Sequence, residues 1–195
     1  PCRAQIMDAY RLLLDCYRKG GKIMLTGNGG SCADCEHIAG ELMKGFYLKR
    51  PLRGEEKAAV HQTTDALLPE TAEILQQGLP AIALTGHAAL STAVQNDIDP
   101  LLGPAQQVVA LGKPGDVVIG ISTSGNAKNA ALAVSVAKAL KMHTLALTGG
   151  SGGRLKSICE HAIVVPGSSP ADVQELHLPV YHTLCAMLEA KFFTE

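Results

Sequence analysis

A histidine and a glutamate stand four residues apart in the first third of the chain, at His37 and Glu41. In a helix both side chains would lie on one face, because residues four apart are neighbours on the helix surface. An imidazole and a carboxylate placed in this way can move protons as an acid–base pair or bind one divalent metal ion. Most isolated pairs with this spacing are solvated surface pairs, so the surrounding sequence has to decide between these interpretations.

A second group of polar residues lies near the C-terminus, in the segment QELHLPVYH at 174–182. Gln174 and His182 are eight residues apart, which is about 12 Å along a helix axis. One metal ion could be reached by both side chains only at full stretch, or one of them comes from another subunit. Pro179 is expected to bend this helix. For His177 we favour a partly buried packing role.

Two turns rich in glycine and hydroxyl residues precede expected helices, at 26–31 (TGNGGS) and 122–126 (STSGN). Backbone N–H groups at a helix N-terminus bind anions, hydroxyl side chains add donors, and glycine allows close approach. Neither turn has the spacing of a Walker loop, and Cys32 stands where a dinucleotide fingerprint needs its third glycine. If the two turns follow neighbouring strands, they favour binding of a phosphate or a phosphosugar over simple helix capping.

The elements that position these residues alternate along the chain. Short apolar runs predict strands at 23–27, 81–86, 117–122, 144–149 and 162–166, and helical stretches are expected at 3–19, 31–44, 126–140, 152–159 and 171–193. Strands that are apolar throughout are buried on both faces, so the expected fold class is α/β, with a parallel sheet between two layers of helices. Residues 46–80 interrupt this pattern and predict a loop with one or two helices, at about 55–63 and 69–77. Such an insertion serves function or assembly.

Composition excludes several classes of protein. The chain has 195 residues, a length typical of one domain, with 47% hydrophobic and 18% charged residues and a net charge of −1. This charge provides no basic patch for nucleic acid, and no apolar run is long enough to span a membrane. The start of the chain predicts an amphipathic helix instead of a signal peptide, so we expect a cytoplasmic protein with six free thiols. Cys32 and Cys35 have the spacing of a redox pair, but small core residues are the simpler interpretation.

Taken together, these motifs resemble a known family. The run GNGGS at 27–31, followed by Asp34, His37 and Glu41, resembles the signature of the sugar isomerase (SIS) family, and within it that of the phosphoheptose isomerases. The resemblance continues in the same order through Asn96-Asp97, Gly115-Asp116-Val117, 121–126 (ISTSGN) and 174–177 (QELH). It extends from about residue 20 to the C-terminus, and the set of motifs is specific although each one alone is not.

The resemblance implies a fold, an assembly and a reaction. It implies a single SIS domain over 1–195, built as a three-layer α-β-α sandwich with a five-stranded parallel sheet. The N-terminal helix and the long C-terminal helix would serve oligomerisation, in a homotetramer with sites at the subunit interfaces. The implied reaction converts sedoheptulose 7-phosphate through an enediol to D-glycero-D-manno-heptose 7-phosphate, a precursor of lipopolysaccharide and other bacterial surface glycans.

The resemblance also assigns roles to residues. Glu41 is the base and His182 the opposing acid or base, while Ser122, Thr123 and Ser124 hold the phosphate. Other residues line the sugar site, namely Asn28, Gly29, Gly30, Ser31, Asn96, Asp97 and Gln174. One zinc ion per subunit would be bound by His37, Glu41, Gln174 and His182. A carboxylate bound to a metal is a weaker base, so the role of the metal stays open between catalytic, regulatory and adventitious.

Three departures from the family pattern bear on substrate choice. Ala127 stands where the family commonly has serine, and Ala171 stands where an acidic residue often occurs, three residues before Gln174. The segment 46–80 is longer than the usual link. Two alternatives therefore stay open: an isomerase of another phosphosugar, and a non-catalytic SIS adaptor that associates with a replication initiator. Such adaptors lack the catalytic glutamate and the terminal histidine, so Glu41 and His182 argue against the adaptor.

Overall fold

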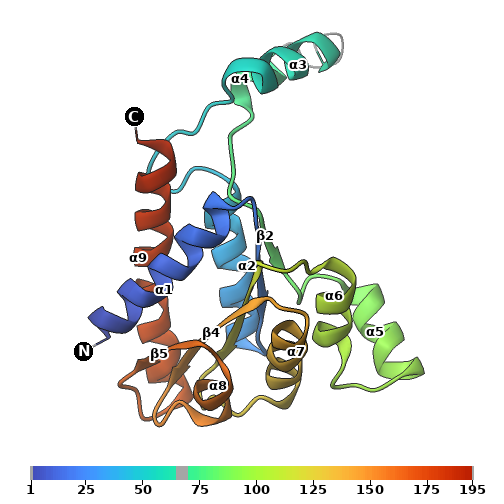
Figure 1. Cartoon of the computed structure of the whole chain (residues 1–195), viewed down its shortest axis with the longest axis vertical. Coiled ribbons are helices and arrows are strands. Elements are labelled where there is room, and N and C mark those ends of the chain that lie inside the picture. The colour runs from blue at the N-terminus through green and yellow to red at the C-terminus, as the bar shows by residue number, and fades with distance from the viewer. Residues whose placement is uncertain (1, 65–69, 195) are drawn as a thin grey trace.

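Five parallel strands form one sheet in the order β2-β1-β3-β4-β5. The computed structural model describes residues 2–64 and 70–194 (Figure 1). The strands are β1 (Ile23–Thr26), β2 (Ala81–Ala83), β3 (Val117–Ser122), β4 (His143–Gly149) and β5 (His161–Val165). All five were predicted from their apolar sequence, although β2 is shorter than the run at 81–86. The order also confirms that the turns after β1 and β3 follow neighbouring strands.

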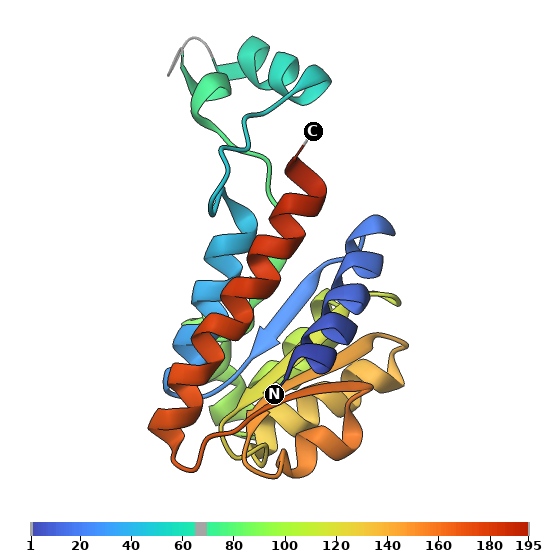
Figure 2. The same ribbon diagram turned by 90° about the vertical axis from the view of Figure 1, so that its left-hand side faces the viewer.

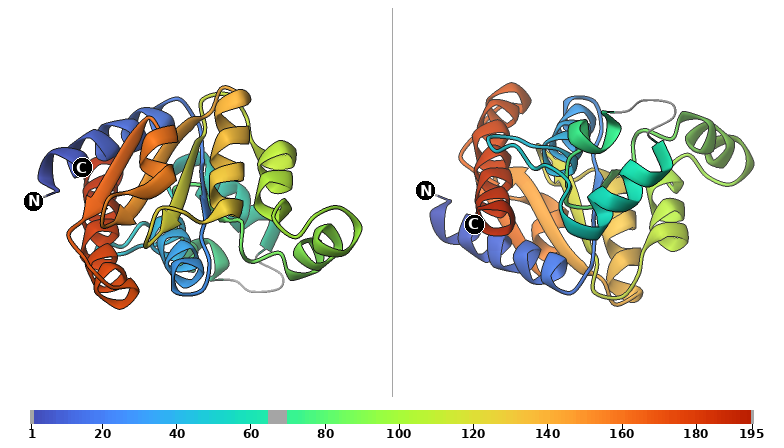
Figure 3. Two further views of the ribbon diagram at one scale, coloured as in Figure 1. Left: turned by 90° about the horizontal axis from the view of Figure 1, so that it is seen from below. Right: turned by 90° about the horizontal axis from the view of Figure 1, so that it is seen from above.

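Helices cover both faces of the sheet. α1 (Arg3–Arg18), α2 (Gly30–Met43) and α9 (Pro170–Phe193) lie on one face, and α6 (Gly103–Leu111), α7 (Lys128–Ala139) and α8 (Gly153–Ile158) on the other. Along β1 the side chains alternate between the two layers: Ile23 and Leu25 pack with the first group, and Met24 with the second. Seen from below or above, α1 and α9 lie on the opposite side of the sheet from α6 and α7 (Figure 3). The expected three-layer fold is confirmed.

Two helices were missed by the sequence analysis, α5 (Ala88–Asp97) and α6. Neither has a side-chain cap at its N-terminus, and in α5 only Val94 is buried. α5 packs against α6 rather than against the sheet. With one buried residue, α5 offers no apolar stripe from which a helix can be recognised, whereas the lack of a cap does not distinguish these helices from α2 and α7, which were predicted.

The insertion between α2 and β2 forms an arm. It contains α3 (Gly54–Thr64) and α4 (Thr71–Ile74), which contact each other. The predicted helix at 69–77 is shorter in the structure, and its first residue, Pro69, lies outside the described residues. A backbone bridge joins Pro51 to Gln76 at the base of the arm. In Figure 2 the arm projects away from the sheet, beyond the C-terminal end of α9.

The last helix is the longest of the described helices and runs through Pro179 from Pro170 to Phe193. Ser169 and Asp172 form a capping box at its N-terminus. The helix lies beside α1 and α2 (Figure 2), so it can carry residues from the edge of the sheet where the strands end to the end of α2. Within the described residues, no helix is long and apolar enough to cross a membrane.

Candidate active site

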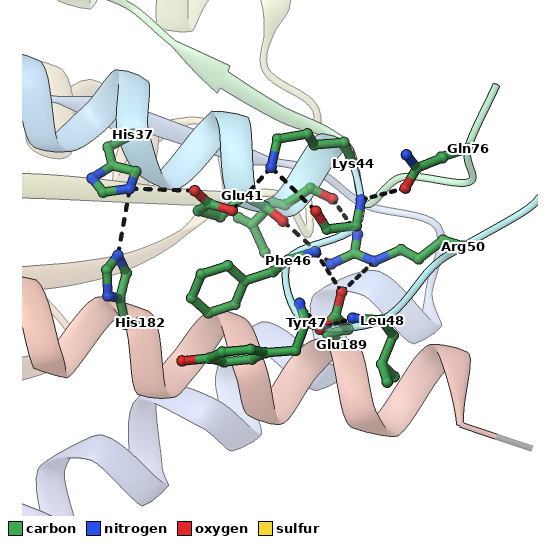
Figure 4. Close-up of polar contacts among 12 residues, drawn as sticks. His37, Glu41, Lys44, Phe46, Tyr47, Leu48, Arg50, Gln76, His182 and Glu189 are labelled. Carbon is green, nitrogen blue, oxygen red and sulfur yellow. Dashed lines mark hydrogen bonds and ion pairs between the residues drawn. The ribbon is translucent and has the colours of Figure 1, made fainter. Parts of the chain in front are cut away.

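Packing of α2 against α9 brings three of the predicted residues together. His37 and Glu41 lie one turn apart on α2, with 3.3 Å between His37 Nε2 and Glu41 Oε1. From α9, His182 places its Nε2 atom 3.4 Å from His37 Nε2 (Figure 4). The Glu41 side chain is 15% exposed and that of His37 42%, so the group faces solvent from a partly buried position. The structure thus brings together side chains from two segments that are more than 140 residues apart along the chain.

A buried tyrosine fixes the orientation of the His37 ring. The hydroxyl of Tyr181 donates to Oδ1 of Asp34 at 3.2 Å and lies 3.0 Å from Nδ1 of His37. Burial raises the pKa of Tyr181, and the charge of Asp34 raises it further, so the hydroxyl keeps its proton. Because that proton goes to Asp34, the oxygen of Tyr181 accepts the Nδ1 proton of His37. The Nε2 atom of His37 then faces Glu41 and His182.

Two further side chains surround the group, and the sequence analysis assigned a role to neither. Nζ of Lys44 lies 3.2 Å from Oε2 of Glu41, one turn further along α2. The ring of Phe46 lies 5.2 Å from that of His182, centroid to centroid. The i, i+3 spacing of Glu41 and Lys44 is the only sequence signal for either contact, since Phe46 reaches His182 through the tertiary fold.

The glycine turn after β1 lies against α9. Gly29 has a positive φ of 55°, and a Cβ atom at Gly30 would overlap the side-chain amide of Gln174. Gln174 therefore packs on the start of α2. Asn28 and Asn129 exchange two amide hydrogen bonds of 2.8 Å each, which tie this turn to α7. Asn28 and Gly29 line a cavity of about 220 Å³, whereas Ser31 is buried.

The hydroxyl-rich turn after β3 borders a separate cavity of about 290 Å³. Thr123 and Ser124 line it, together with the loop after β4 and the start of α9, at residues including Gly150, Ser151, Ser168 and Ser169. Gly125 closes the turn with a φ of +69°, and its N–H donates to the carbonyl of Ser122 at 3.0 Å. Ser122 itself is buried. Hydroxyl side chains gathered around one cavity at the start of a helix can donate hydrogen bonds to a phosphate group.

The remaining predicted residues are placed apart from these groups. Asn96 and Asp97 end α5, are exposed, and bond to each other at 2.8 Å. They line neither of the two cavities. Ala127 is the N-cap of α7 and provides no side-chain cap. Beside Ala171, the carboxylate of Asp172 accepts bonds from Ser168 and Ser169, and these bonds lower the pKa of Asp172, the larger effect coming from Ser169.

Comparisons with known proteins identify the family. The SIS domain family matches residues 2–77 and 70–149. The phosphoheptose isomerase of Campylobacter jejuni is 40% identical over 190 residues, covering 97% of this chain and 88% of that protein. The chain belongs to the SIS domain family, among the phosphoheptose isomerases. It is therefore an enzyme, an isomerase of the aldose–ketose type.

Two solved structures of phosphoheptose isomerases share the fold. The enzyme of Neisseria gonorrhoeae has a TM-score of 0.76 and 32% identity, with coverage of 96% of this chain and 86% of that one. For the enzyme of Francisella tularensis the TM-score is 0.77 and the identity 33%, with coverage of 95% and 85%. The similarity to named phosphoheptose isomerases favours an isomerase over the non-catalytic adaptor, while the substrate and the roles of single residues stay predictions.

The zinc ion implied for a phosphoheptose isomerase can be tested against the donor atoms. Tetrahedral zinc with ligands at about 2.1 Å holds neighbouring donors about 3.4 Å apart. The separations of His37 Nε2 from Glu41 Oε1 and from His182 Nε2, 3.3 and 3.4 Å, match this value. Within the described residues, however, no three His, Cys, Asp or Glu side chains are arranged to hold one ion together. Donor types and two spacings fit zinc, and a complete four-ligand site stays a prediction.

Proposed function

We propose that this chain converts sedoheptulose 7-phosphate to D-glycero-D-manno-heptose 7-phosphate. The observation that supports the proposal most directly is the meeting of His37 and Glu41 on α2 with His182 on α9, in a member of the phosphoheptose isomerases. A carboxylate and an imidazole are the two groups that an aldose–ketose isomerisation needs. The alternative is isomerisation of another phosphosugar by the same residues.

In the proposed reaction, Glu41 transfers protons at the carbon atoms and His182 transfers protons at the oxygen atoms. Glu41 removes a proton from C1 of the ketose and later returns one to C2. His182 gives a proton to the oxygen on C2 as the C1–C2 double bond forms, and accepts the proton of the C1 hydroxyl as the enediol collapses to the aldose. Lys44, which is 3.2 Å from Glu41, provides positive charge where negative charge develops on the enediol. Each proton removed is thus returned to the sugar.

The length of the substrate suits the spacing along α9. Val173 borders the cavity assigned to the phosphate, and Tyr181 and His182 lie in the proton-transfer group. Eight or nine residues of helix advance roughly 12–14 Å. An extended chain advances roughly 1.2 Å per bond, so the eight bonds from C1 to the phosphorus span about 10 Å. A seven-carbon phosphate therefore covers most of this distance, and a triose phosphate does not.

Three further parts of the proposal concern metal, assembly and location. One zinc ion per subunit would be held by His37, Glu41, Gln174 and His182, and when bound it would polarise the oxygens on C1 and C2. We propose a homotetramer in which α1 and α9 serve the subunit contacts. A cytoplasmic location agrees with the six free cysteines, Cys2, Cys16, Cys32, Cys35, Cys159 and Cys185.

A direct assay tests the proposal. Purified protein is mixed with sedoheptulose 7-phosphate, with and without zinc, and formation of the aldose phosphate is followed. Fructose 6-phosphate and ribulose 5-phosphate, a hexose and a pentose phosphate, are assayed in parallel. Glu41→Gln is expected to abolish turnover with the fold intact. Glu36→Gln is the matched control, because Glu36 is an exposed carboxylate on the same helix that takes no part in the proposed chemistry.

The outcomes distinguish the proposed reaction from isomerisation of another phosphosugar and from a mechanism without Glu41. Turnover of the heptose phosphate that disappears in Glu41→Gln and persists in Glu36→Gln supports the proposed reaction. Turnover of a shorter phosphosugar alone would replace the substrate and keep the mechanism. Full activity in Glu41→Gln would overturn the role given to this carboxylate. Size-exclusion chromatography with light scattering gives the subunit number.

A further inference from the structure

A buried ion pair lies behind the proton-transfer group, outside the residues assigned so far. Nε of Arg50 is 2.8 Å from Oε1 of Glu189, and the two side chains are 0% and 1% exposed. A buried ion pair is often no more stabilising than two well-packed apolar side chains, because both charges lose their hydration. Its presence beside a candidate active site therefore calls for an explanation other than stability.

The pair connects three segments of the chain (Figure 4). The carboxylate of Glu189 accepts the backbone N–H groups of Phe46 and Tyr47 at 2.7 Å and of Leu48 at 3.1 Å. The guanidinium of Arg50 donates to backbone carbonyls at the end of α2, which have no partner within the helix. Segment 46–50, the end of α2 and the last turns of α9 are thereby fixed to one another.

The groups held by this pair belong to the candidate active site. Arg50 donates to the carbonyl of Leu42 at 2.7 Å and to that of Glu41, the proposed base, at 3.2 Å. Phe46, whose N–H is held by Glu189, places its ring against His182. Glu189 is seven residues after His182, on the same side of α9 two turns further on. The ion pair thus acts on the base through its backbone and on the histidine through Phe46.

We propose that Arg50 and Glu189 are positioning residues for Glu41 and His182, an inference that rests on the proposed function. Neither residue touches the substrate. Together they set the separation and orientation of α2 and α9 at the point where the two proton-transferring side chains meet. A displacement of about 1 Å in such a group can lower the rate about 100-fold, so a rigid, fully hydrogen-bonded support has a direct effect on catalysis.

The test replaces both charges together. Arg50→Met with Glu189→Met leaves no buried charge without a partner, which is the main reason why a single replacement would unfold the region. We expect the double variant to fold and its kcat to fall about 10–100-fold, with KM changed less than about threefold. Arg50→Gln with Glu189→Gln also leaves no charge without a partner, keeps an acceptor for the backbone N–H groups of Phe46, Tyr47 and Leu48, and is expected to lie between wild type and the Met–Met variant.

A second ion pair provides the matched control. Lys22 and Asp116 are 2.5 Å apart, with side chains 19% and 4% exposed, and join the starts of β1 and β3 without contacting His37, Glu41 or His182. Lys22→Met with Asp116→Asn is expected to lower the melting temperature and leave kcat unchanged. If the control pair lowers kcat as much as the Arg50–Glu189 pair does, the effect is general loss of stability, and the proposal is wrong.

An NMR measurement without substrate distinguishes failure of the positioning role from failure of the proposed function. The ring protons of His182, assigned by their loss in His182→Gln, are recorded by NMR in wild type and in the Met–Met variant, or in Arg50→Gln with Glu189→Gln if the Met–Met variant does not fold. Loss of the Phe46 ring contact is expected to shift them. A shift together with no turnover of any phosphosugar by wild type would refute the proposed function alone. An unshifted His182 resonance, or unchanged kcat in the folded variant, would overturn the positioning role.

Discussion

The hydroxyl oxygen of Tyr181 lies 3.0 Å from Nδ1 of His37, and its hydrogen is donated to Asp34. This contact fixes which nitrogen of His37 carries the proton. It therefore leaves Nε2 as the nitrogen that faces Glu41 and His182. A partner of this kind behind a ligating histidine typically contributes 10–100-fold to metal affinity or activity.

Removing that hydroxyl gives the first prediction. Tyr181→Phe is expected to lower zinc affinity or kcat about 10–100-fold, because His37 loses the acceptor that holds its tautomer. Isothermal titration with zinc and steady-state kinetics measure the two effects. Tyr17→Phe is the control, since it removes a buried hydroxyl that bonds the carbonyl of Pro80, away from the site. Equal losses in both variants would show that only packing had been disturbed.

Gly30 provides a second prediction, with a control in the same helix. A methyl group at Gly30 would overlap the amide of Gln174, whereas one at Gly40 meets no atom within 4 Å. Gly30→Ala is expected to displace Gln174 and raise KM for the phosphosugar. Gly40→Ala is expected to leave KM unchanged and stabilise α2 by about 1 kcal/mol, since alanine has the higher helix propensity. Kinetics and thermal unfolding of both variants are compared. An unchanged KM in Gly30→Ala would remove Gln174 from the substrate site.

The fold was predictable from the sequence because its strands are buried on both faces and read as uninterrupted apolar runs. The turns after β1 and β3 were predictable for a related reason, since their glycines and hydroxyl residues sit directly at strand ends. The helices at Ala88–Asp97 and Gly103–Leu111 were not predicted; the first buries only Val94 and packs on the second instead of on the sheet.

Some residues of the candidate site could also be predicted from the sequence, and others could not. His37 and Glu41 could be paired by their helical spacing, and His182 was assigned through the family resemblance. Tyr181, Phe46 and the Arg50–Glu189 pair act through contacts between segments more than 130 residues apart, for which local sequence gives no signal. Asn96 and Asp97 were assigned to the sugar site through the resemblance alone. The structure places them at the exposed end of α5, bonded to each other, and their role stays a prediction.

Ala127 gives a third prediction, because it occupies a helix N-cap without a capping side chain. Ala127→Ser supplies a hydroxyl that can accept a bond from the first turn of α7, which typically adds about 1 kcal/mol of stability. For a chain of this length we expect the melting temperature to rise by about 2–4 °C. The same hydroxyl adds a donor beside the turn that precedes α7, so KM for the phosphosugar is expected to fall. A higher melting temperature with unchanged KM would limit the effect to capping.

The last prediction concerns acid stability and His177. This side chain is fully buried, and neither ring nitrogen has a hydrogen-bond partner in the described structure. Burial lowers the pKa of His177 below its usual value, which is about 6.5 in the unfolded chain. As the pH falls through 6.5 the unfolded chain binds a proton that the folded protein does not, so stability is present above this pH and decreases below it.

His177→Leu is expected to remove this part of the pH dependence. The free energy of unfolding in urea is measured at pH 7.5 and pH 5.5, at one protein concentration, for wild type and variant. Wild type should lose more stability on acidification than His177→Leu, because the leucine has no proton to bind in either state. His87→Gln, which removes an exposed histidine, should retain the wild-type loss. Equal acid-induced losses in wild type and His177→Leu would mean that the folded protein accommodates protonated His177 as readily as the unfolded chain does.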